Sequence, residues 1–255
     1  MSTVVAVEDD GPVRILTLDG ASRLNSLAAS TADALRDAII AAEREPSVHA
    51  LVLTGAGNHF SAGGDAEGVL EVELDESDDA YARFMRTYKM AAEAVWETPL
   101  PVVAAVAGIA YGGAFNLAMA CDLVVASRSA RFCQVFMRRG VVPDFGGAFV
   151  LPRLIGLRKA TELMLLADEI DAESACRIGL VNEVVESPEL AFTRALGLAH
   201  RLAAQPRLAV SMTKRMLRAG ASGDFQAALE IEALSQATAL SSRGARQAFQ
   251  AFQDR

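Results

Sequence analysis

Short apolar runs alternate with amphipathic segments along most of the chain. Residues 4–7 and 13–18 are rich in β-branched side chains and flank Asp10-Gly11, a pair typical of a hairpin turn. Residues 31–45 place alanine, leucine and isoleucine at helical spacing with charges between them, which predicts an amphipathic helix. The same reasoning predicts strands at residues 50–54, 102–106 and 123–126, and helices within residues 75–97 and at 112–121. Strands that alternate with helices indicate βαβ units and therefore an α/β fold with a parallel sheet.

The pattern changes after about Pro188, where consecutive helices replace the alternation. Helical spacing recurs in four segments, at residues 191–204, 207–219, 225–240 and 244–253. Proline, glycine and serine separate these segments, as is typical of helix ends. We therefore predict two regions, an α/β core over residues 1–190 and a C-terminal helical region over residues 191–255.

The segment from Thr98 to Cys121 contains no charged residue and is long enough to cross a bilayer. It nevertheless includes two prolines and three glycines, and it is flanked by Glu97 and Asp122 instead of lysine or arginine. These features favour a buried strand, turn and helix, so we expect no association with a membrane.

Composition narrows the class of protein further. The chain has 255 residues, of which 52% are hydrophobic, and 32 acids against 24 bases give a formal net charge of −8. This length and apolar content suit a folded chain with one large core, and the charge gives no support for nucleic-acid binding. The three cysteines lack the spacing of a disulfide framework or a zinc site, so we expect no metal and a cytoplasmic location.

Two glycine-rich turns, at residues 60–65 and 107–114, are the candidate chemical motifs. Each lies between a predicted strand and a predicted helix start. Glycine permits positive φ and close approach of the backbone to a ligand, while a helix N-terminus leaves amide groups unpaired. Two such turns side by side are able to donate two N–H bonds to one developing oxyanion. The alternative is that both are simply tight turns.

These turns and their flanks resemble the crotonase superfamily, which comprises enoyl-CoA hydratases and isomerases. The first turn, Phe60-Ser-Ala-Gly-Gly-Asp65, is similar to the F-x-A-G-x-D signature of that family, and residues 106–122 are similar to its second glycine signature. The resemblance covers nearly the whole chain, because it continues through Asn25-Ser26-Leu27 and residues 130–134, 140–147, 151–156, 172–175 and 179–181.

The resemblance implies a ββα-spiral core with a C-terminal helical trimerisation region, so the expected assembly is a homotrimer or a hexamer formed by two trimers. It implies an acyl-CoA thioester as substrate, with coenzyme A as part of that substrate and no separate cofactor. The amides of Gly64 and Gly113 would form the oxyanion hole. The other positions expected to bind the substrate are Arg23, Leu24, Ala62, Gly63, Asp65, Tyr111 and Phe136. Further candidates are Glu67 and Cys133 for the acyl pocket, and Arg243, Arg246 and Arg255 for the phosphates of coenzyme A.

The sequence departs from the hydratase pattern at two positions. Typical hydratases of this family carry two glutamates, and the corresponding residues here are Asn116 and Phe136. Neither side chain titrates, so neither can act as a general base or general acid. Asp144, in the apolar and glycine-rich run 141–147, is the candidate to replace them, because burial there would raise its pKa. The alternative is that Asp144 caps a helix that begins near Gly146.

Relatives with a Pro-Asp-x-Gly-Gly motif include enoyl-CoA isomerases, among them the isomerase of the phenylacetyl-CoA pathway, in which this aspartate is the acid and base. The resemblance therefore implies an isomerase in which Asp144 moves a proton between C2 and C4 of an enoyl chain through a dienolate. Two alternatives stay open. One is another chemistry of the superfamily, such as hydration, hydrolysis or decarboxylation, and the other is a non-catalytic acyl-CoA-binding subunit.

Overall fold

A six-stranded sheet with strand order β1-β2-β3-β4-β6-β9 forms the centre of the molecule. The computed structural model describes residues 3–66, 68, 79–221 and 223–253. The strands of this sheet are β1 (Val4–Asp10), β2 (Val13–Asp19), β3 (Ala50–Gly55), β4 (Val102–Val106), β6 (Leu123–Ser127) and β9 (Glu183–Val185). β1 and β2 form the predicted antiparallel hairpin, and all other neighbours pair in parallel. The predicted α/β class is thus confirmed.

A second, three-stranded sheet consists of β5 (Ile109–Tyr111), β7 (Arg131–Cys133) and β8 (Ile170–Asp171). β5 pairs in parallel with β7, and β8 pairs antiparallel with β7. The chain passes from the first sheet into the second between β4 and β5. The second glycine-rich turn lies at this crossing, so its backbone is held by both sheets.

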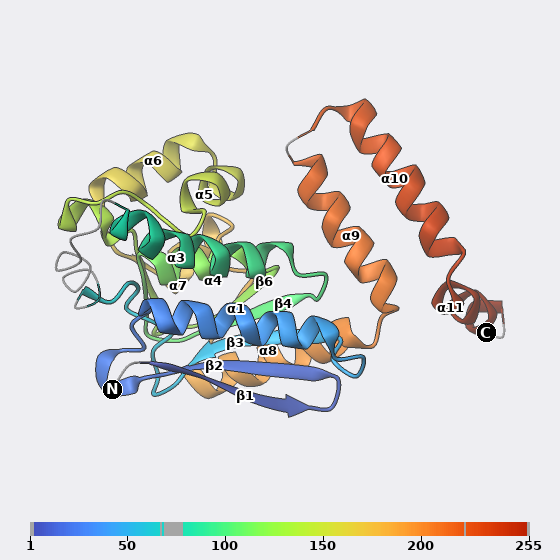
Figure 1. Cartoon of the computed structure of the whole chain (residues 1–255), viewed down its shortest axis with the longest axis horizontal. Coiled ribbons are helices and arrows are strands. Elements are labelled where there is room, and N and C mark those ends of the chain that lie inside the picture. Colours follow the sequence, from blue (N-terminus) through green and yellow to red (C-terminus); the bar gives the residue numbers. More distant parts are fainter. Residues whose placement is uncertain (1–2, 67, 69–78, 222, 254–255) are drawn as a thin grey trace.

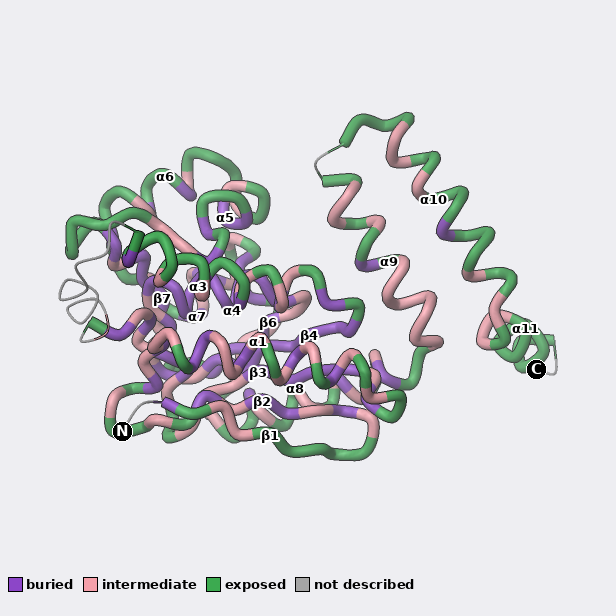
Figure 2. The backbone as a smooth tube through the Cα atoms, viewed as in Figure 1, coloured by how far each residue is buried: buried purple, intermediate pink, exposed green. Residues whose placement is uncertain are grey.

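Helices cover both faces of the six-stranded sheet (Figure 1). The helical elements are η1 (Ala21–Arg23), α1 (Ala29–Arg44), α3 (Ala80–Glu97), α4 (Gly113–Ala120), η2 (Val135–Arg139), α5 (Gly147–Ile155), α6 (Leu157–Leu166), α7 (Ala172–Arg177), α8 (Pro188–Ala203), α9 (Arg207–Gly220), α10 (Phe225–Leu240) and α11 (Arg243–Gln253). In β3, Leu51 and Leu53 pack with α1 and α3, whereas Ala50 and Val52 pack with α8. This alternation follows the two-residue period of a strand, and the central strands β3 and β4 are largely buried (Figure 2).

The uncharged segment 98–121 forms β4, β5 and α4, as the buried strand, turn and helix interpretation predicts. All residues of α4 are buried. The ring of Phe115 in this helix lies 5.5 Å from that of Phe132 in β7, measured between centroids. Within the described residues, no helix has both the length and the hydropathy needed to cross a bilayer. The neighbouring helix α3 begins at Ala80, and residues 75–78 of the predicted helical segment lie outside the described residues.

The helices that project from the core are α9, α10 and α11 (Figure 1). α8 packs on the sheet through alanines spaced four residues apart, Ala191, Ala195 and Ala199. The projection therefore begins with α9, after the boundary predicted at residue 190. The small side chains of α8 allow close approach to the strands, whereas in the sequence they resemble those of the helices that follow.

A buried charge cluster anchors α9 to the core. Asp122 accepts hydrogen bonds from Lys214 at 2.7 Å, from Arg218 at 2.9 Å and from the main-chain N–H of Val102 at 2.8 Å. Lys214 also donates to the main-chain oxygen of Leu100 at 2.8 Å, and burial lowers its pKa against the opposing effect of Asp122. Without Asp122 the buried ammonium would lose its counter-charge, which costs about 3 kcal/mol. The start of the projecting region is thus fixed by charges that face inward.

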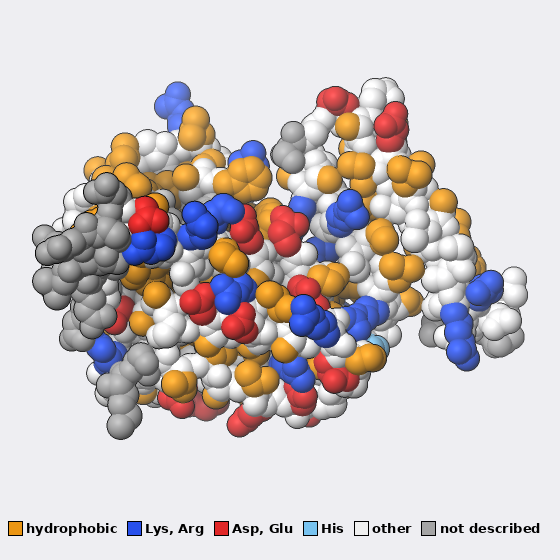
Figure 3. Space-filling view, in the orientation of Figure 1, with side chains coloured by type: hydrophobic (Ala, Val, Ile, Leu, Met, Phe, Trp, Pro, Cys, Tyr) orange, Lys and Arg blue, Asp and Glu red, His pale blue; other side chains and the backbone are white. Residues whose placement is uncertain are grey.

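The projecting helices expose large apolar side chains. Figure 3 shows hydrophobic groups along α9 and α10 on the solvent side. The most exposed are Leu217, Phe225, Leu234 and Phe252, each with about 70% or more of its surface accessible. Large exposed apolar patches on folded chains are typical of protein interfaces, so this region is suited to contact another protein surface.

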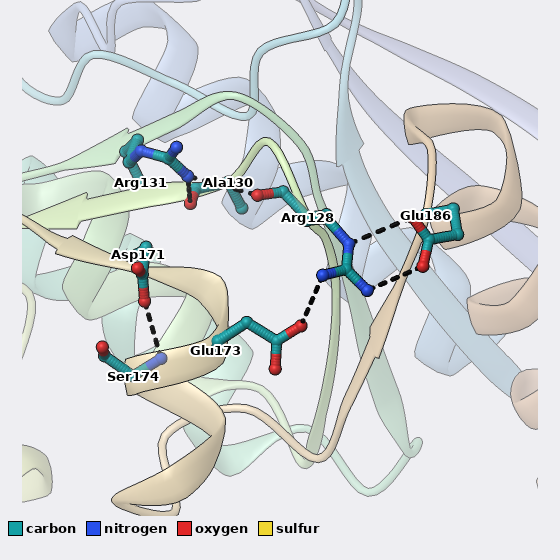
Figure 4. Close-up of polar contacts among 7 residues, drawn as sticks. All are labelled: Arg128, Ala130, Arg131, Asp171, Glu173, Ser174 and Glu186. Carbon is teal, nitrogen blue, oxygen red and sulfur yellow. Dashed lines mark hydrogen bonds and ion pairs between the residues drawn. The ribbon is translucent and has the colours of Figure 1, made fainter.

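Beside the second sheet, an exposed network of charges joins three segments (Figure 4). Arg128, after β6, contacts Glu186 at 2.7 Å and Glu173 of α7 at 3.3 Å. Asp171 caps α7 by accepting the N–H of Ser174 at 2.7 Å. Exposed ion pairs contribute about 0–1 kcal/mol each, so this network orders the loops more than it stabilises the fold.

Candidate functional site

The two glycine-rich turns lie side by side. The main-chain N–H of Ser61 donates to Ile109 at 3.0 Å, and the N–H of Tyr111 donates back to Ser61 at 3.1 Å. Phe60 donates to Ala107 at 2.8 Å in the same ladder. These bonds bring residues 60–65 against the N-terminus of α4, so turns that are far apart in the sequence form one structural unit.

Glycine is required where the turns touch. Gly63 has a φ of +85°, and a Cβ at this position would lie 2.4 Å from the main-chain oxygen of Tyr111 and 3.4 Å from the nitrogen of Gly113. Gly113 is the first residue of α4, so its N–H precedes the first intrahelical hydrogen bond, from Asn116 to Gly112. Within the described part of the chain, the N–H groups of Gly113 and Gly64 have no hydrogen-bond acceptor. Two main-chain donors are therefore left open at this junction.

A cavity of about 290 Å³ lies at this junction. It is lined by Ala62, Gly64, Ala66, Gly112, Gly113, Val135, Phe136, Arg139, Val141 and Asp144. The structure thus brings together five of the residues singled out from the sequence, namely Ala62, Gly64, Gly113, Phe136 and Asp144. The lining is largely apolar, with the two open amides, one carboxyl and one guanidinium as its polar groups, which is the usual character of a small-molecule site.

The carboxyl of Asp144 is the titratable acid of this cavity. Its Oδ1 atom is buried and has no hydrogen-bond partner among the described residues. A Cβ on Gly113 would lie 3.0 Å from this oxygen, which places the carboxyl beside the first amide of α4. Burial raises the pKa of Asp144 to about 6, because an apolar surrounding disfavours the charged form. A carboxyl with this pKa can both accept and return a proton near neutral pH.

The structure does not support the alternative in which the Asp144 side chain caps a helix. α5 begins at Gly147 and is preceded by Gly146 with a φ of +76°, and no side chain caps it. Only the main-chain oxygen of Asp144 takes part in this turn, as acceptor for the N–H of Gly147 at 2.9 Å. Phe145 has a φ of +46°, an uncommon conformation for a residue other than glycine. This backbone turn leaves the Asp144 carboxyl free of the helix.

Asn116 and Phe136, the residues at the two glutamate positions, have different roles in the structure. The Asn116 side chain is 1% exposed and is bonded within the protein. Its Nδ2 donates to the main-chain oxygen of Asp144 at 2.9 Å, and its Oδ1 accepts from Nε2 of Gln134 at 2.7 Å. Phe136 lines the cavity with its ring. Among the described lining residues, Asp144 is the only carboxyl.

Other residues predicted from the sequence lie near the cavity without lining it. The hydroxyl of Tyr111 is hydrogen-bonded to Glu169, and burial is the main cause that raises its pKa to about 12. Cys133 donates to the main-chain oxygen of Ala167 at 3.1 Å and is packed in the core. Leu24 has a φ of +53°. These three residues serve packing and the loop conformation in the structure.

The basic residues expected to contact coenzyme A are scattered. Arg23 pairs with Asp65 at 3.3 Å, next to the first glycine-rich turn. Arg243 and Arg246 are on α11 in the projecting region. Arg255 lies outside the described residues, as does Glu67, a candidate for the acyl pocket.

Sequence reasoning missed Arg139 and Gln134. Arg139 lines the cavity from the end of η2, and the only sign of it in the sequence is the pair Arg138-Arg139 before Gly140. Gln134 is fully buried, and its side chain is hydrogen-bonded to that of Asn116. A buried glutamine between Cys133 and Val135 carries no signal of its own, because its partner is eighteen residues away.

The raised pKa of Asp144 makes a prediction for stability. The native state binds this proton more tightly than the unfolded state, whose carboxyl has an ordinary pKa, so Asp144 lowers the free energy of unfolding as the pH rises from about 4 to about 6. The loss is at most about 3 kcal/mol. Urea unfolding at pH 4 to 7 will show this fall in the wild type and a smaller one in Asp144→Asn. Equal pH dependence in the two proteins would contradict the burial of this carboxyl.

Comparison with known proteins shows the family to which this chain belongs. The family model for enoyl-CoA hydratase/isomerase matches residues 8–255. The chain belongs to the enoyl-CoA hydratase/isomerase family. It is 38% identical to a protein of Rhodobacter capsulatus named probable enoyl-CoA hydratase, over 93% of this chain and 90% of that one. It is 34% identical to the 1,2-epoxyphenylacetyl-CoA isomerase of Escherichia coli, over 86% of this chain and 84% of that one.

The solved structures of this family agree with the fold. A structure from Streptomyces coelicolor, described as a putative enoyl-CoA hydratase, superposes with a TM-score of 0.93 at 37% identity, over 98% of this chain and 91% of that one. The predicted crotonase-like core is thereby confirmed. Both hydratase and isomerase names occur among family members of similar identity, so membership of the family does not determine the reaction.

Proposed function

We propose that this member of the enoyl-CoA hydratase/isomerase family moves a double bond within an enoyl-CoA. The observation that carries the proposal is the Asp144 carboxyl, whose Oδ1 is buried and has no partner among the described residues, in the same cavity as the two open amides of Gly64 and Gly113. Coenzyme A enters as part of the substrate, and the reaction needs no separate cofactor. One base beside two N–H groups that can bind an oxyanion is sufficient for a proton shift.

In the proposed reaction, the N–H groups of Gly64 and Gly113 hold the thioester oxygen of the substrate. The Asp144 carboxylate takes a proton from C4 or C2 of the enoyl chain, and the negative charge passes to the thioester oxygen as a dienolate. The amides stabilise this oxygen more strongly in the dienolate than in the substrate, an effect of about 3–4 kcal/mol for one such donor in other enzymes. The protonated carboxyl then returns the proton to the other carbon, so atoms and charge balance.

Hydration is the second candidate, because other relatives bear hydratase names, such as the crotonyl-CoA hydratase of Syntrophomonas wolfei at 34% identity. Hydration has to activate a water molecule and to protonate a carbon. Of the two positions at which typical hydratases carry glutamate, Asn116 is bonded to protein groups and Phe136 is apolar. One carboxyl in the described lining therefore favours the proton shift over the addition of water.

Incubation with a 3-enoyl-CoA and with a 2-enoyl-CoA in deuterated water tests the proposal. We expect migration of the double bond, with deuterium at the allylic carbons, detected by mass spectrometry and NMR. A 3-hydroxyacyl-CoA product would instead show hydration. Binding without exchange or product would show that the chain is a non-catalytic acyl-CoA-binding subunit, and either result would refute the isomerase.

We also propose that the projecting helices associate with further copies of the chain, as a homotrimer or as a hexamer of two trimers. Support comes from the exposed apolar side chains of α9, α10 and α11, among them Leu217, Phe225 and Phe252. Light scattering after size exclusion is expected to give three or six times the 27.0 kDa chain mass. A monomer at micromolar concentration would contradict this assembly.

A further inference from the structure

Asp144 is held from behind the cavity by two buried amide side chains, Asn116 and Gln134. Gln134 Nε2 donates to Asn116 Oδ1 at 2.7 Å, and Asn116 Nδ2 donates to the main-chain oxygen of Asp144 at 2.9 Å. Asn116 is 1% exposed and Gln134 is 0% exposed, and neither lines the cavity. Both polar atoms of the Asn116 side chain are hydrogen-bonded to protein groups. Asn116 can therefore affect the reaction only by way of Asp144.

The direction of these hydrogen bonds is determined by Asp144. A main-chain carbonyl only accepts, so Asn116 has to present its Nδ2 to Asp144 and its Oδ1 to Gln134. Gln134 must then turn its own Nε2 toward Asn116, and its Oε1 is left buried without a partner among the described residues. An unpaired buried acceptor lowers the stability of the fold. The unpaired Oε1 of Gln134 follows from the orientation that Asp144 imposes on Asn116.

The last glycine of the Pro-Asp-x-Gly-Gly motif, Gly147, packs directly against the Asn116 side chain. A Cβ at Gly147 would lie 2.3 Å from Asn116 Nδ2, a distance that no packing tolerates. Glycine at this position therefore lets Asn116, on α4, reach the turn that contains Asp144. The first amide of α4 and the acid of the cavity are thus tied to the same helix.

We propose that Asn116, oriented by Gln134, is a positioning residue that holds the main chain of Asp144 and thereby points the Asp144 carboxyl into the cavity beside Gly113. The role in catalysis rests on the proposed function, because it needs Asp144 to carry the proton. The placement of the carboxyl does not depend on that function.

The groups around Asp144 determine how its pKa would change if the hydrogen bond from Asn116 were lost. Among the described residues, Tyr88 of α3 is close enough to be affected by the charges of Asp144 and Asp65, and Arg139 lines the cavity. Asn116 and Gln134 are neutral, so removing them changes no charge at the site. A carboxyl released from its apolar position turns toward water, and its pKa falls toward the ordinary value.

The test uses two neutral variants of similar size, Gln134→Met and Asn116→Leu. We measure kcat and KM against pH for double-bond migration in a 3-enoyl-CoA. We expect kcat to fall about tenfold to a hundredfold, since misplacement of a catalytic group has effects of this order. KM changes little because neither residue touches the substrate, and the apparent pKa of kcat/KM falls by about one unit.

Thr31→Val is the matched control. Thr31 is 1% exposed, and its Oγ1 donates to the main-chain oxygen of Thr3 at 2.6 Å, away from the cavity. The Thr31→Val variant thus removes one buried hydrogen bond from a side chain to a main-chain oxygen. It should leave kcat and the apparent pKa of kcat/KM as in the wild type. Unchanged kcat and pKa in Gln134→Met overturn the positioning role, even if Asn116→Leu fails to fold.

A second measurement does not depend on activity. The free energy of unfolding in urea is measured between pH 4 and pH 6 for the wild type and for Gln134→Met, each with and without Asp144→Asn. The difference within each pair gives the pH dependence of stability that is due to Asp144. In the Gln134→Met background, we expect at least half of the pH dependence due to Asp144 to disappear. If the wild type moves no double bond and this reduction is present, the proposed function is wrong and the positioning role stands. If double bonds migrate but the reduction is absent, the positioning role is wrong.

Discussion

Replacement of Asp144 by asparagine is expected to lower kcat for double-bond migration about a thousandfold. Asparagine keeps the size of the side chain, but its carboxamide cannot take a proton from carbon, and general acid–base groups contribute about 10²–10⁴ in rate. The affinity for the enoyl-CoA should stay within about threefold, because the amides of Gly64 and Gly113 are unchanged. Initial rates, deuterium incorporation and a binding titration measure the two quantities separately.

The matched control for this variant is Asp37→Asn. Its carboxyl is 66% exposed on α1 and pairs only with the neighbouring Arg36 among the described residues, so the same chemical change there should leave kcat as in the wild type. In the wild type, kcat/KM should rise with pH through an apparent pKa of about 6, since the carboxylate is the active form of the base. An Asp144→Asn enzyme with the wild-type rate would show that another group moves the proton.

Gly113→Ala is expected to have the second-largest effect, a fall in kcat of about a hundredfold. The new Cβ would lie 2.8 Å from Cδ2 of Phe145 and 3.0 Å from Oδ1 of Asp144. One methyl group would therefore displace both the wall of the cavity and its acid, next to the amide that binds the thioester oxygen. Overpacking of this kind also costs about 1–3 kcal/mol of stability. Steady-state kinetics and urea unfolding of the purified variant measure the two effects.

Gly64→Ala is the control for this variant, because it makes the same change at the other glycine of the pair. A Cβ at Gly64 meets no atom within 4 Å, so the variant should unfold like the wild type and lose less than about tenfold in kcat. Similar rates for Gly64→Ala and Gly113→Ala would mean that contact with Asp144 and Phe145 is unimportant at this site.

Much of the fold was predictable because its hydrophobic pattern is strong. The hairpin has β-branched runs on both sides of Asp10-Gly11, helix α1 has a helical period, and β4 is an uninterrupted apolar run. Each of the three appears where it is expected. The end of the core was harder to predict. The alanines of α8 give a helical period, but a stripe of small side chains does not show whether its partner is a sheet of the same chain or another surface.

The site was predictable where it depends on glycine and not where it depends on long-range hydrogen bonds. Gly64 and Gly113 stand out in the sequence, and Asp144 stands out because the glutamates are missing. The bond from Asn116 to the main chain of Asp144 crosses 28 positions, and only the folded chain shows it. The hydrogen bond from the Tyr111 hydroxyl to Glu169 is likewise shown only by the folded chain, because it crosses 58 positions.

The complete burial of α4 has a consequence for how the protein responds to heat. Local opening of a protein begins where contacts are few and the backbone meets water, and α4 has neither property, because each of its residues is enclosed. The Gly113 amide and the Asn116 side chain belong to this helix, so they keep their places until the core itself opens. Thermal inactivation of the enzyme should therefore coincide with melting of the core and should not precede it.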